Sequence, residues 1–211
     1  MQIISTNIAK PGFVTINGKT QHTGIHKKPT VQPIYLEKDN VKGDEVTNRK
    51  VHGGVYKACY LFSANHYPHW KNLYPNLDWH YGMLGENLTV EGLDETQLYV
   101  GDVYKVGNAL IQVTQPREPC TTFAAKMGTP KIMEQFIAHG RPGTYTKVLK
   151  EGNVTVGDTI ELLEKANNSI SIADFFKLIF DREKNQEHLQ IIVNSDALPE
   201  KKQKELKRFL K

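Results

Sequence analysis

Short runs in which apolar and polar residues alternate fill much of the first 165 positions of the chain. The clearest pair comprises residues 103–106 and 109–114, which flank the dipeptide Gly107-Asn108. Two alternating runs joined by such a two-residue turn predict a β-hairpin. Residues 13–16 lead into Asn17-Gly18, the strongest short hairpin signal, and predict a second hairpin. The pattern therefore favours a β-rich fold.

Further strands are expected where short apolar runs are bounded by glycine or proline, and helices where apolar residues recur at helical spacing. The tripeptide Val-Gly-Asp occurs twice, at 100–102 and 156–158, and predicts two tight strand entries in which glycine supplies the unusual backbone angle. Many short strands with few helices predict a mainly β protein built on a closed or nearly closed barrel. The additional strands are expected at 31–36, at 51–62 and in a hairpin from 145–149 to 154, and the helices at 66–74, 121–127 and 129–140.

The pattern changes near residue 166, where helical spacing replaces alternation. Ser171 begins a capping-box-like start, and two further helices are expected at 186–193 and 199–210. We therefore predict two parts, a β-barrel domain over 1–165 and a C-terminal three-helix segment over 166–211. The lysines of the last helix are interpreted as a solvated face.

Composition limits the classes of protein to consider. The 211 residues are 39% hydrophobic and 24% charged, as in an ordinary globular protein. A formal net charge of +4 is too small to indicate a nucleic-acid partner, but it is compatible with a basic pocket for an anionic ligand. No run approaches the roughly 18 apolar residues that a membrane span requires, and no secretory signal is visible. Two cysteines outside any C-x-x-C pair suggest free thiols and a cytoplasmic location.

Cys120 is the strongest candidate for chemistry. It follows Pro116 and Pro119, which stiffen the chain, and it precedes the expected helix at 121–127, with Arg117 close in sequence. A helix start and a neighbouring cation both favour the thiolate, the form that reacts and binds metals. The alternative is a buried, inert cysteine, which is the usual fate of this residue and the interpretation we adopt for Cys59.

Several other residues are weaker candidates for a functional site. His52 stands beside Gly53-Gly54, which would let a ligand approach the backbone closely, although a lone histidine is more often structural. Glu86 and Asn87 place a carboxylate and an amide on a turn, and Lys27 lies in a polar loop suited to an anion or to solvent. The sequence contains no phosphate-binding loop, dinucleotide fingerprint, zinc-protease motif or nucleophile elbow.

Five short motifs together resemble the MOSC family, named after the C-terminal domain of molybdenum cofactor sulfurases, and most of all its stand-alone bacterial YiiM-type members. Each motif alone is weak, but five in the same order and spacing are specific. The resemblance covers about residues 10 to 163, and the helical tail resembles the three-helix segment that follows the domain in that subgroup. The motifs are Lys42-Gly43-Asp44, Val51-His52-Gly53-Gly54, Gly85-Glu86-Asn87-Leu88, Val100-Gly101-Asp102 and Gln115-Pro116-Arg117-Glu118-Pro119-Cys120.

The resemblance implies a β-barrel that binds the molybdenum cofactor (molybdopterin), with Cys120 as the protein ligand to molybdenum. It further implies an oxidoreductase that reduces N-hydroxylated compounds, such as purine bases, with electrons from a separate flavoprotein reductase. Cys120, His52 and Glu86 would be catalytic, with His52 delivering protons. Lys27 and Arg117 would hold the pterin phosphate, and Asn87 and Gly53 would also line the site. Thr121 to Phe123 depart from relatives that often carry a tyrosine or other large residue after the cysteine, which bears on substrate preference.

Two other functions stay open. The protein could carry the cofactor, or a persulfide sulfur on Cys120, and hand it on without turnover of its own. A cysteine nucleophile acting on acyl groups would need a base and an oxyanion hole, and His52 is the only attractive base. In the leading interpretation the partners are the reductase and a small-molecule substrate, with no nucleic acid and no membrane, and a homodimer is a candidate assembly.

Overall fold

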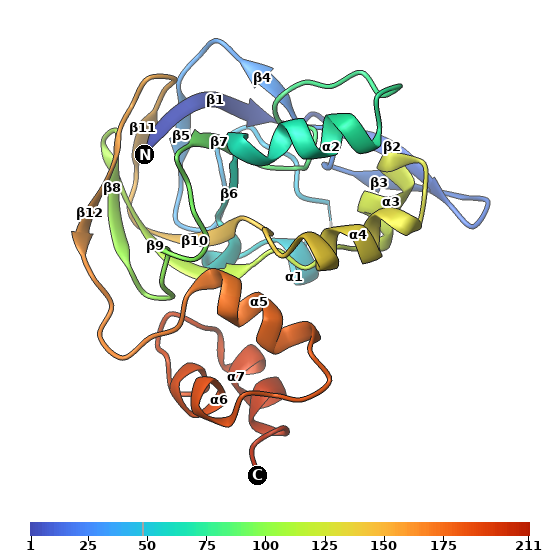
Figure 1. Cartoon of the computed structure of the whole chain (residues 1–211). Coiled ribbons are helices and arrows are strands. Elements are labelled where there is room, and N and C mark those ends of the chain that lie inside the picture. The colour runs from blue at the N-terminus through green and yellow to red at the C-terminus, as the bar shows by residue number, and fades with distance from the viewer. Residues whose placement is uncertain (48) are drawn as a thin grey trace.

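The structure is a computed structural model that describes residues 1–47 and 49–211, apart from the side chains of residues 50 and 51. Strands dominate the first three quarters of the chain, and helices form its end (Figure 1). The strands are β1 (Gln2–Ile8), β2 (Gly12–Ile16), β3 (Lys19–Thr23), β4 (Lys28–Thr30), β5 (Ile34–Leu36), β6 (Cys59–Ser63), β7 (Leu88–Glu91), β8 (Val103–Val106), β9 (Ala109–Pro116), β10 (Thr144–Lys150), β11 (Gly152–Val154) and β12 (Ile160–Glu164). The α-helices are α1 (Arg49–His52), α2 (Tyr67–Leu73), α3 (Thr121–Met127), α4 (Lys131–His139), α5 (Ile172–Phe180), α6 (Gln186–Ile192) and α7 (Glu200–Lys207).

Eight of the described strands form one sheet in the order β12-β8-β9-β10-β6-β7-β1-β4. The pairing of β6 with β7 is parallel and the other ladders are antiparallel, so the sheet is mixed. The mainly β prediction is confirmed, but no closed barrel is found. Strand β4 occupies the free edge of β1 over Thr6 to Ile8. Near the start of β1, Gln2 forms an isolated bridge with Thr159, and backbone hydrogen bonds join Ile3 to Gly157 and Asp158 and Met1 to Ile160. The two ends of the sheet therefore approach each other without a continuous ladder, and the sheet is open.

The two hairpins with strong turn signals are confirmed. Strands β8 and β9 pair from Val106↔Ala109 outward around Gly107-Asn108. Strands β2 and β3 form a separate two-stranded sheet, whose turn residues Asn17 and Gly18 have φ values of 50° and 73°. Positive φ at both positions is what a twisted two-residue hairpin requires, and Asn-Gly supplies it at low cost. In Figure 1 this hairpin projects from one side of the molecule.

Predictions that depended on distant pairing were less accurate. The expected hairpin from β10 into β11 is wrong, because β11 pairs with β5 while β10 lies between β9 and β6. The stretch expected to be a strand from residue 51 begins as the short helix α1 and a 3-10 turn at Val55–Lys57, and becomes extended only at Cys59. Val31 lies outside both β4 and β5 and is 94% exposed.

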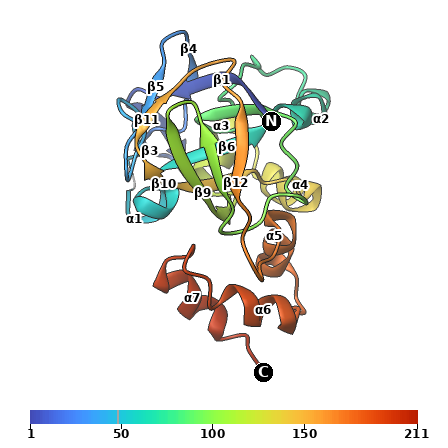
Figure 2. The ribbon, with the colours of Figure 1, turned by 90° about the vertical axis from the view of Figure 1, so that its left-hand side faces the viewer.

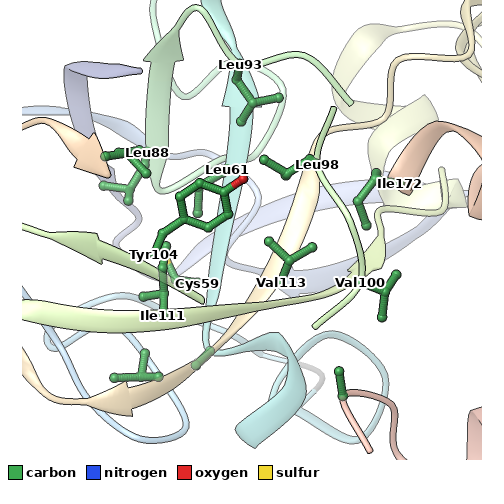
Figure 3. Packing of buried hydrophobic residues seen from close by; sticks show 14 of the residues in the cluster. Cys59, Leu61, Leu88, Leu93, Leu98, Val100, Tyr104, Ile111, Val113 and Ile172 are labelled. Carbon is green, nitrogen blue, oxygen red and sulfur yellow. The ribbon is translucent and has the colours of Figure 1, made fainter. Parts of the chain in front are cut away.

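Two hydrophobic clusters hold these elements together. The first fills the concave side of the sheet with mostly aliphatic residues, including Cys59 (Figure 3), and it extends into the C-terminal helices. The second is aromatic and lies around α2, α3 and α4. Helix α5 joins them, since Phe175 belongs to the first cluster and Phe176 to the second. Figures 1 and 2 both place α5, α6 and α7 together at one end of the sheet.

The expected helix signals are largely confirmed. The Ser171 hydroxyl accepts a hydrogen bond from the Asp174 N–H at the start of α5, and α4 ends at Gly140 with φ 69°. The prediction for the lysines of α7 needs a correction, because Lys202 is only 7% exposed. Among the described residues, no helix is both long and apolar enough to cross a bilayer.

Candidate functional site

A cavity of about 910 Å³, including its open mouth, lies between the β2–β3 hairpin and the start of α3. Segments far apart in sequence meet on its wall, including the end of β3, the stretch 44–47 and α1. Five of the residues singled out from the sequence line it directly: Lys27, His52, Asn87, Arg117 and Cys120.

Cys120 is the N-cap of α3 and has an extended backbone with φ −136°. Helix α3 ends at Gly128, whose φ of 75° is left-handed, and so the predicted helix after the cysteine is confirmed. The thiol is half-buried on the cavity wall. This position exposes the sulfur to a ligand while keeping most of the residue packed.

The electrostatic surroundings of Cys120 favour its thiolate. Burial alone raises the pKa of the thiol, but a hydrogen bond from the His52 side chain, the charge of Arg117 and the backbone N–H of Phe123 outweigh it. The net effect lowers the pKa from 9.0 to about 7. Near neutral pH a large fraction of Cys120 is therefore the anion that binds soft metals or acts as a nucleophile.

Cys59 shows the opposite behaviour. It is fully buried in the first hydrophobic cluster, and burial is the largest cause of a raised thiol pKa. The prediction that Cys59 is a core residue is confirmed.

Arg117 is held among aromatic rings at the cavity wall. Its guanidinium carbon lies 4.1 Å from the ring centroid of Phe123 and 5.1 Å from that of Phe136, and the residue is 5% exposed. Its Nη1 atom is buried and has no hydrogen-bond partner among the described residues. A buried charged donor without a partner is costly, and such a group is normally satisfied by an ion, a water or a ligand.

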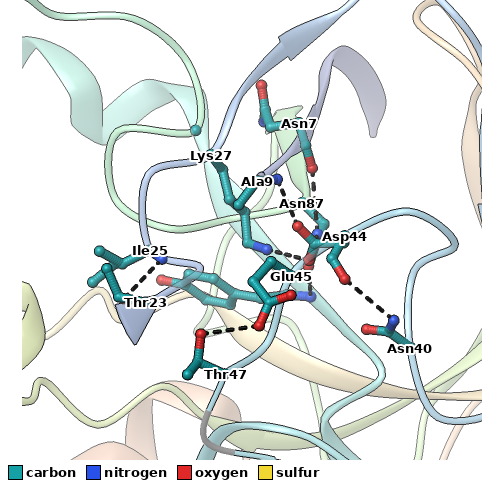
Figure 4. A network of polar contacts seen from close by, with 12 residues as sticks. Asn7, Ala9, Thr23, Ile25, Lys27, Asn40, Asp44, Glu45, Thr47 and Asn87 are labelled. Atoms are coloured by element: carbon teal, nitrogen blue, oxygen red, sulfur yellow. Dashed lines mark hydrogen bonds and ion pairs between the residues drawn. The ribbon is translucent and has the colours of Figure 1, made fainter. Parts of the chain in front are cut away.

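Another part of the cavity wall is a network of polar contacts (Figure 4). Lys27 forms a buried ion pair with Asp44. Asp44 also accepts hydrogen bonds from the Ala9 N–H at 2.7 Å and from the Asn87 side-chain amide at 2.9 Å. The Asn87 side-chain amide also donates a hydrogen bond to the Asn7 carbonyl at 3.3 Å, and its oxygen accepts one from the Tyr60 N–H at 3.2 Å. Lys27 and Asn87 thus have protein partners on the side of the cavity that joins β1, β6 and the stretch before α1.

Two predicted site residues do not reach the cavity. Glu86 is fully buried outside the cavity wall, and its Oε1 accepts hydrogen bonds from the Tyr67 hydroxyl, from the Gly82 N–H at 2.8 Å and from Thr89 Oγ1 at 2.8 Å. This placement does not support a catalytic contact, and it assigns Glu86 to fixing the turn that precedes Asn87.

Gly53 is the second predicted site residue that does not line the cavity. Its N–H bonds the Arg49 carbonyl, and a Cβ built on it would lie 3.1 Å from Arg49 Cα. Its lack of a side chain serves the close packing of α1, and the predicted close approach of a ligand does not explain it.

Asp44 and the β2–β3 hairpin are cavity features that the sequence analysis did not assign. Asp44 belongs to the Lys-Gly-Asp motif, but nothing local shows that it pairs with Lys27. Gln21 and His22 of β3 line the cavity, and the His22 ring packs against Phe13 with a centroid separation of 4.4 Å. In the described part of the chain, no group of three or more His, Cys, Asp or Glu side chains is arranged to hold a metal ion.

Comparison with known proteins identifies the family. The profile of the MOSC domain matches residues 48–161. The chain belongs to the MOSC domain family. It is 34% identical to the uncharacterized protein YflK of Bacillus subtilis over 198 residues, which is 94% of this chain and 89% of YflK.

Two further relatives bear on the MOSC assignment. The chain is 32% identical over 160 residues to a protein of Gibberella moniliformis named "Reductase", a match that covers 74% of this chain and 28% of that protein. The crystal structure of YiiM from Geobacillus stearothermophilus superposes with a TM-score of 0.82 at 30% identity, covering 100% of this chain and 99% of the other. The resemblance to YiiM-type MOSC proteins is therefore shown in both sequence and fold.

Proposed function

We propose that this MOSC protein binds the molybdenum cofactor in the cavity beside Cys120 and reduces N-hydroxylated compounds to their amino or imino forms and water. The observation that carries the proposal is a half-buried thiol with a pKa of about 7 on the same wall as a buried guanidinium nitrogen that lacks a partner. Membership of the family and similarity to a protein named "Reductase" support the same conclusion.

The residues present fit such a group. A thiolate is a soft ligand suited to a thiophilic metal centre. The unsatisfied Nη1 of Arg117 suits an oxygen of a phosphate, which guanidinium groups bind well. Lys27 adds positive charge elsewhere on the cavity wall, although Asp44 already pairs with it. Lys57, which also lines the cavity, has a pKa lowered chiefly by burial.

The cofactor would supply the transfer of two electrons, chemistry that side chains cannot provide. The chain would supply ligation, orientation and protons. Cys120 would bind the metal through its sulfur, and Arg117 would hold the phosphate end of the pterin. His52 already bonds the thiol, so in the bound state its imidazole would lie close to the reacting atoms and could deliver a proton to a departing hydroxyl. Two protons and two electrons convert each N–OH into N–H and water, with the electrons coming from a separate flavoprotein reductase.

The test is purification of the wild type, Cys120→Ser and Cys59→Ala from a host that makes the cofactor, followed by molybdenum analysis and turnover of an N-hydroxylated purine with a chemical reductant. We expect stoichiometric molybdenum and turnover in the wild type and in Cys59→Ala, and loss of both in Cys120→Ser. Equal molybdenum content and turnover in all three proteins would contradict the proposal.

A carrier function is the second candidate, and the same observation favours it. A thiol with a pKa near neutrality, bonded to an imidazole, is also suited to accepting sulfur from a persulfide donor. Intact-mass analysis distinguishes the two functions. One additional sulfur atom on Cys120, together with no turnover of any N-hydroxylated compound, would identify a carrier.

A further inference from the structure

Lys202 occupies an unusual position in α7. Lys202 and Leu206 are spaced by four residues, so they lie on one face of the helix, and Leu198 lies just before the helix begins. The two leucines are 2% and 3% exposed and belong to the first hydrophobic cluster, and Lys202 between them is 7% exposed. The other lysines of α7 are exposed. A single buried charged residue thus lies on the side of α7 that packs against the first hydrophobic cluster.

The ammonium group of Lys202 reaches the loop that carries the candidate site. Its Nζ lies 2.9 Å from Glu118 Oε1 and 3.1 Å from Glu205 Oε1. Glu118 lies between Arg117, with its unsatisfied nitrogen, and Pro119, which precedes Cys120. The end of the chain therefore contacts the stretch 117–120 directly. Lys57 on the cavity wall is coupled to the same cluster, since Glu118, Lys202 and Glu205 all contribute to its pKa after burial.

Docking of α7 does not require this lysine. The helix is already anchored by Leu198 and Leu206, and Ala197 just before it packs 3.9 Å from the position that a Cβ on Gly101 would occupy. Removing an ammonium group from water is costly, and an apolar residue of similar length at this position would bury well without that cost. The charge of Lys202 is therefore best explained by its ion pair with Glu118.

The loop is restrained at Arg117, which packs against aromatic rings, and at Cys120, whose carbonyl accepts from the Ala124 N–H, and Lys202 adds a contact at Glu118 between them. Pro116 and Pro119 have no N–H, and the stretch 117–120 belongs to no strand or helix. Lys202 is the hydrogen-bond donor that the described structure gives to the Glu118 side chain. Fixing Glu118 fixes the backbone from which Arg117 and Cys120 project on either side.

We propose that Lys202 is a positioning residue for the cavity, which holds Glu118 and thereby the Arg117–Cys120 stretch, so that the C-terminal helical segment forms part of the site. The proposal rests on the assignment of Arg117 and Cys120 to a ligand-binding wall, and not on the identity of the ligand. It predicts that Lys202 acts on the loop far more than on the stability of the helix.

The experiment is hydrogen–deuterium exchange on the full chain without cofactor, comparing wild type, Lys202→Met, Glu118→Gln and the double variant. Lys204→Met is the matched control, because Lys204 is exposed and pairs only within α7, with Glu200. We expect exchange in peptides spanning 117–123 to become about fivefold faster in each single variant, the upper range for a partly exposed ion pair. The double variant should show no further increase, because both changes break one contact. Peptides from α5 to α7, and the whole of Lys204→Met, should match the wild type.

A second readout is the rate at which iodoacetamide modifies Cys120 at a fixed pH. It should change in Lys202→Met, return to the wild-type rate in Lys202→Arg, and stay unchanged in Lys204→Met. Unaltered exchange over 117–123 in Lys202→Met would overturn the proposal. Equal acceleration throughout α7 would also overturn it, because Lys202 would then only dock the helix. Both readouts use protein without molybdenum, so they are independent of the metal analysis that tests the proposed function.

Discussion

Two parts of the cavity wall differ in whether their polar atoms have hydrogen-bond partners. The first part carries Asp44 and Asn87, and the second carries Arg117 and Cys120. On the first wall, the Asp44 carboxylate and both ends of the Asn87 amide have protein partners. On the second, Arg117 Nη1 has no partner in the described structure, and the thiol of Cys120 is tuned towards its anion. Both walls are built from buried charged and polar residues, and they use these residues for different purposes.

The difference separates scaffold from ligand site. A satisfied buried network fixes the backbone and gains little from a ligand, because its hydrogen bonds are already made. A wall with an unpaired donor and a reactive anion is destabilising by itself and gains when a ligand binds. Substitutions at the second wall should therefore cost less stability than substitutions at the first. They should cost more function. The variants below test this division.

The largest effect on stability is expected for Asp44→Ala. It would leave the Lys27 ammonium buried without its partner and remove the acceptor for the Ala9 N–H and the Asn87 amide. Breaking a buried pair in this way typically costs about 3–5 kcal/mol. Urea unfolding of the cofactor-free protein measures the loss. Asp39→Ala is the control, because Asp39 and Arg49 are both about half exposed and their ion pair should contribute less than about 1 kcal/mol. Similar losses for the two variants would show that the first wall is not a scaffold.

Arg117→Met should change stability little and weaken cofactor binding strongly, in contrast to Asp44→Ala. The lost cation–π contacts with Phe123 and Phe136 contribute about 1 kcal/mol, and removal of a buried donor without a partner offsets that loss. Stability should therefore change little. Binding of an anionic cofactor should weaken by about 2 kcal/mol, or roughly 30-fold, through one missing charged hydrogen bond. Molybdenum retained after extensive dialysis measures this effect. Arg141→Met, which removes a partly exposed partner of Asp94, should retain as much metal as the wild type.

The pH dependence of Cys120 gives a third and smaller effect. Its folded-state pKa of about 7 lies below the ordinary value of 9.0, so the thiolate predominates above pH 7 and is lost as the pH falls through that value. The stability that this lowered pKa contributes is fully present above pH 9.0 and is lost as the pH falls from 9.0 through about 7. The alkylation rate of Cys120 in cofactor-free protein should therefore be half-maximal near pH 7.

The His52→Ala variant should move that midpoint towards higher pH, since it removes the largest of the interactions that lower the pKa. Cys59 should stay unmodified in folded Cys120→Ser at every pH, because it is fully buried. An unshifted midpoint in His52→Ala would show that the hydrogen bond to the thiol is not what sets its acidity.

Local sequence signals predicted local structure well. Gly107-Asn108 located the β8–β9 turn, Ser171 located the start of α5, and the prolines before Cys120 located a stiff loop that ends at a helix. In each case the physical cause lies within a few residues of the element. The motif that contains Cys120 was readable for the same reason, because its chemistry depends on a helix start and on Arg117.

Features set by distant contacts were not predictable in this way. The pairing of β11 with β5 depends on segments more than a hundred residues apart, and so does the isolated bridge between Gln2 and Thr159 where the sheet stays open. Glu86 looked like a site carboxylate, yet its side chain turns into the interior to meet Tyr67. Lys202 looked solvated because its neighbours are lysines, and only the docked helix shows that it faces Glu118. The type of a residue limits the interactions that its side chain can form, whereas the tertiary fold determines which partner it meets.

The smallest effect on function is expected for Glu86→Gln, which tests whether burial outside the cavity excludes a catalytic role. The amide can still accept from Gly82 and Thr89, but it loses the negative charge that strengthens these bonds. We expect the free energy of unfolding to fall by about 1–2 kcal/mol, while turnover per bound molybdenum stays within about twofold of the wild type.

Tyr67→Phe is the matched control for Glu86→Gln. It removes one donor to the same carboxylate and should lower stability without changing turnover. If Glu86→Gln kept its stability and its metal but lost turnover, while Tyr67→Phe did not, the carboxylate would have to act within the cavity. Burial outside the cavity would then not exclude a catalytic role for Glu86.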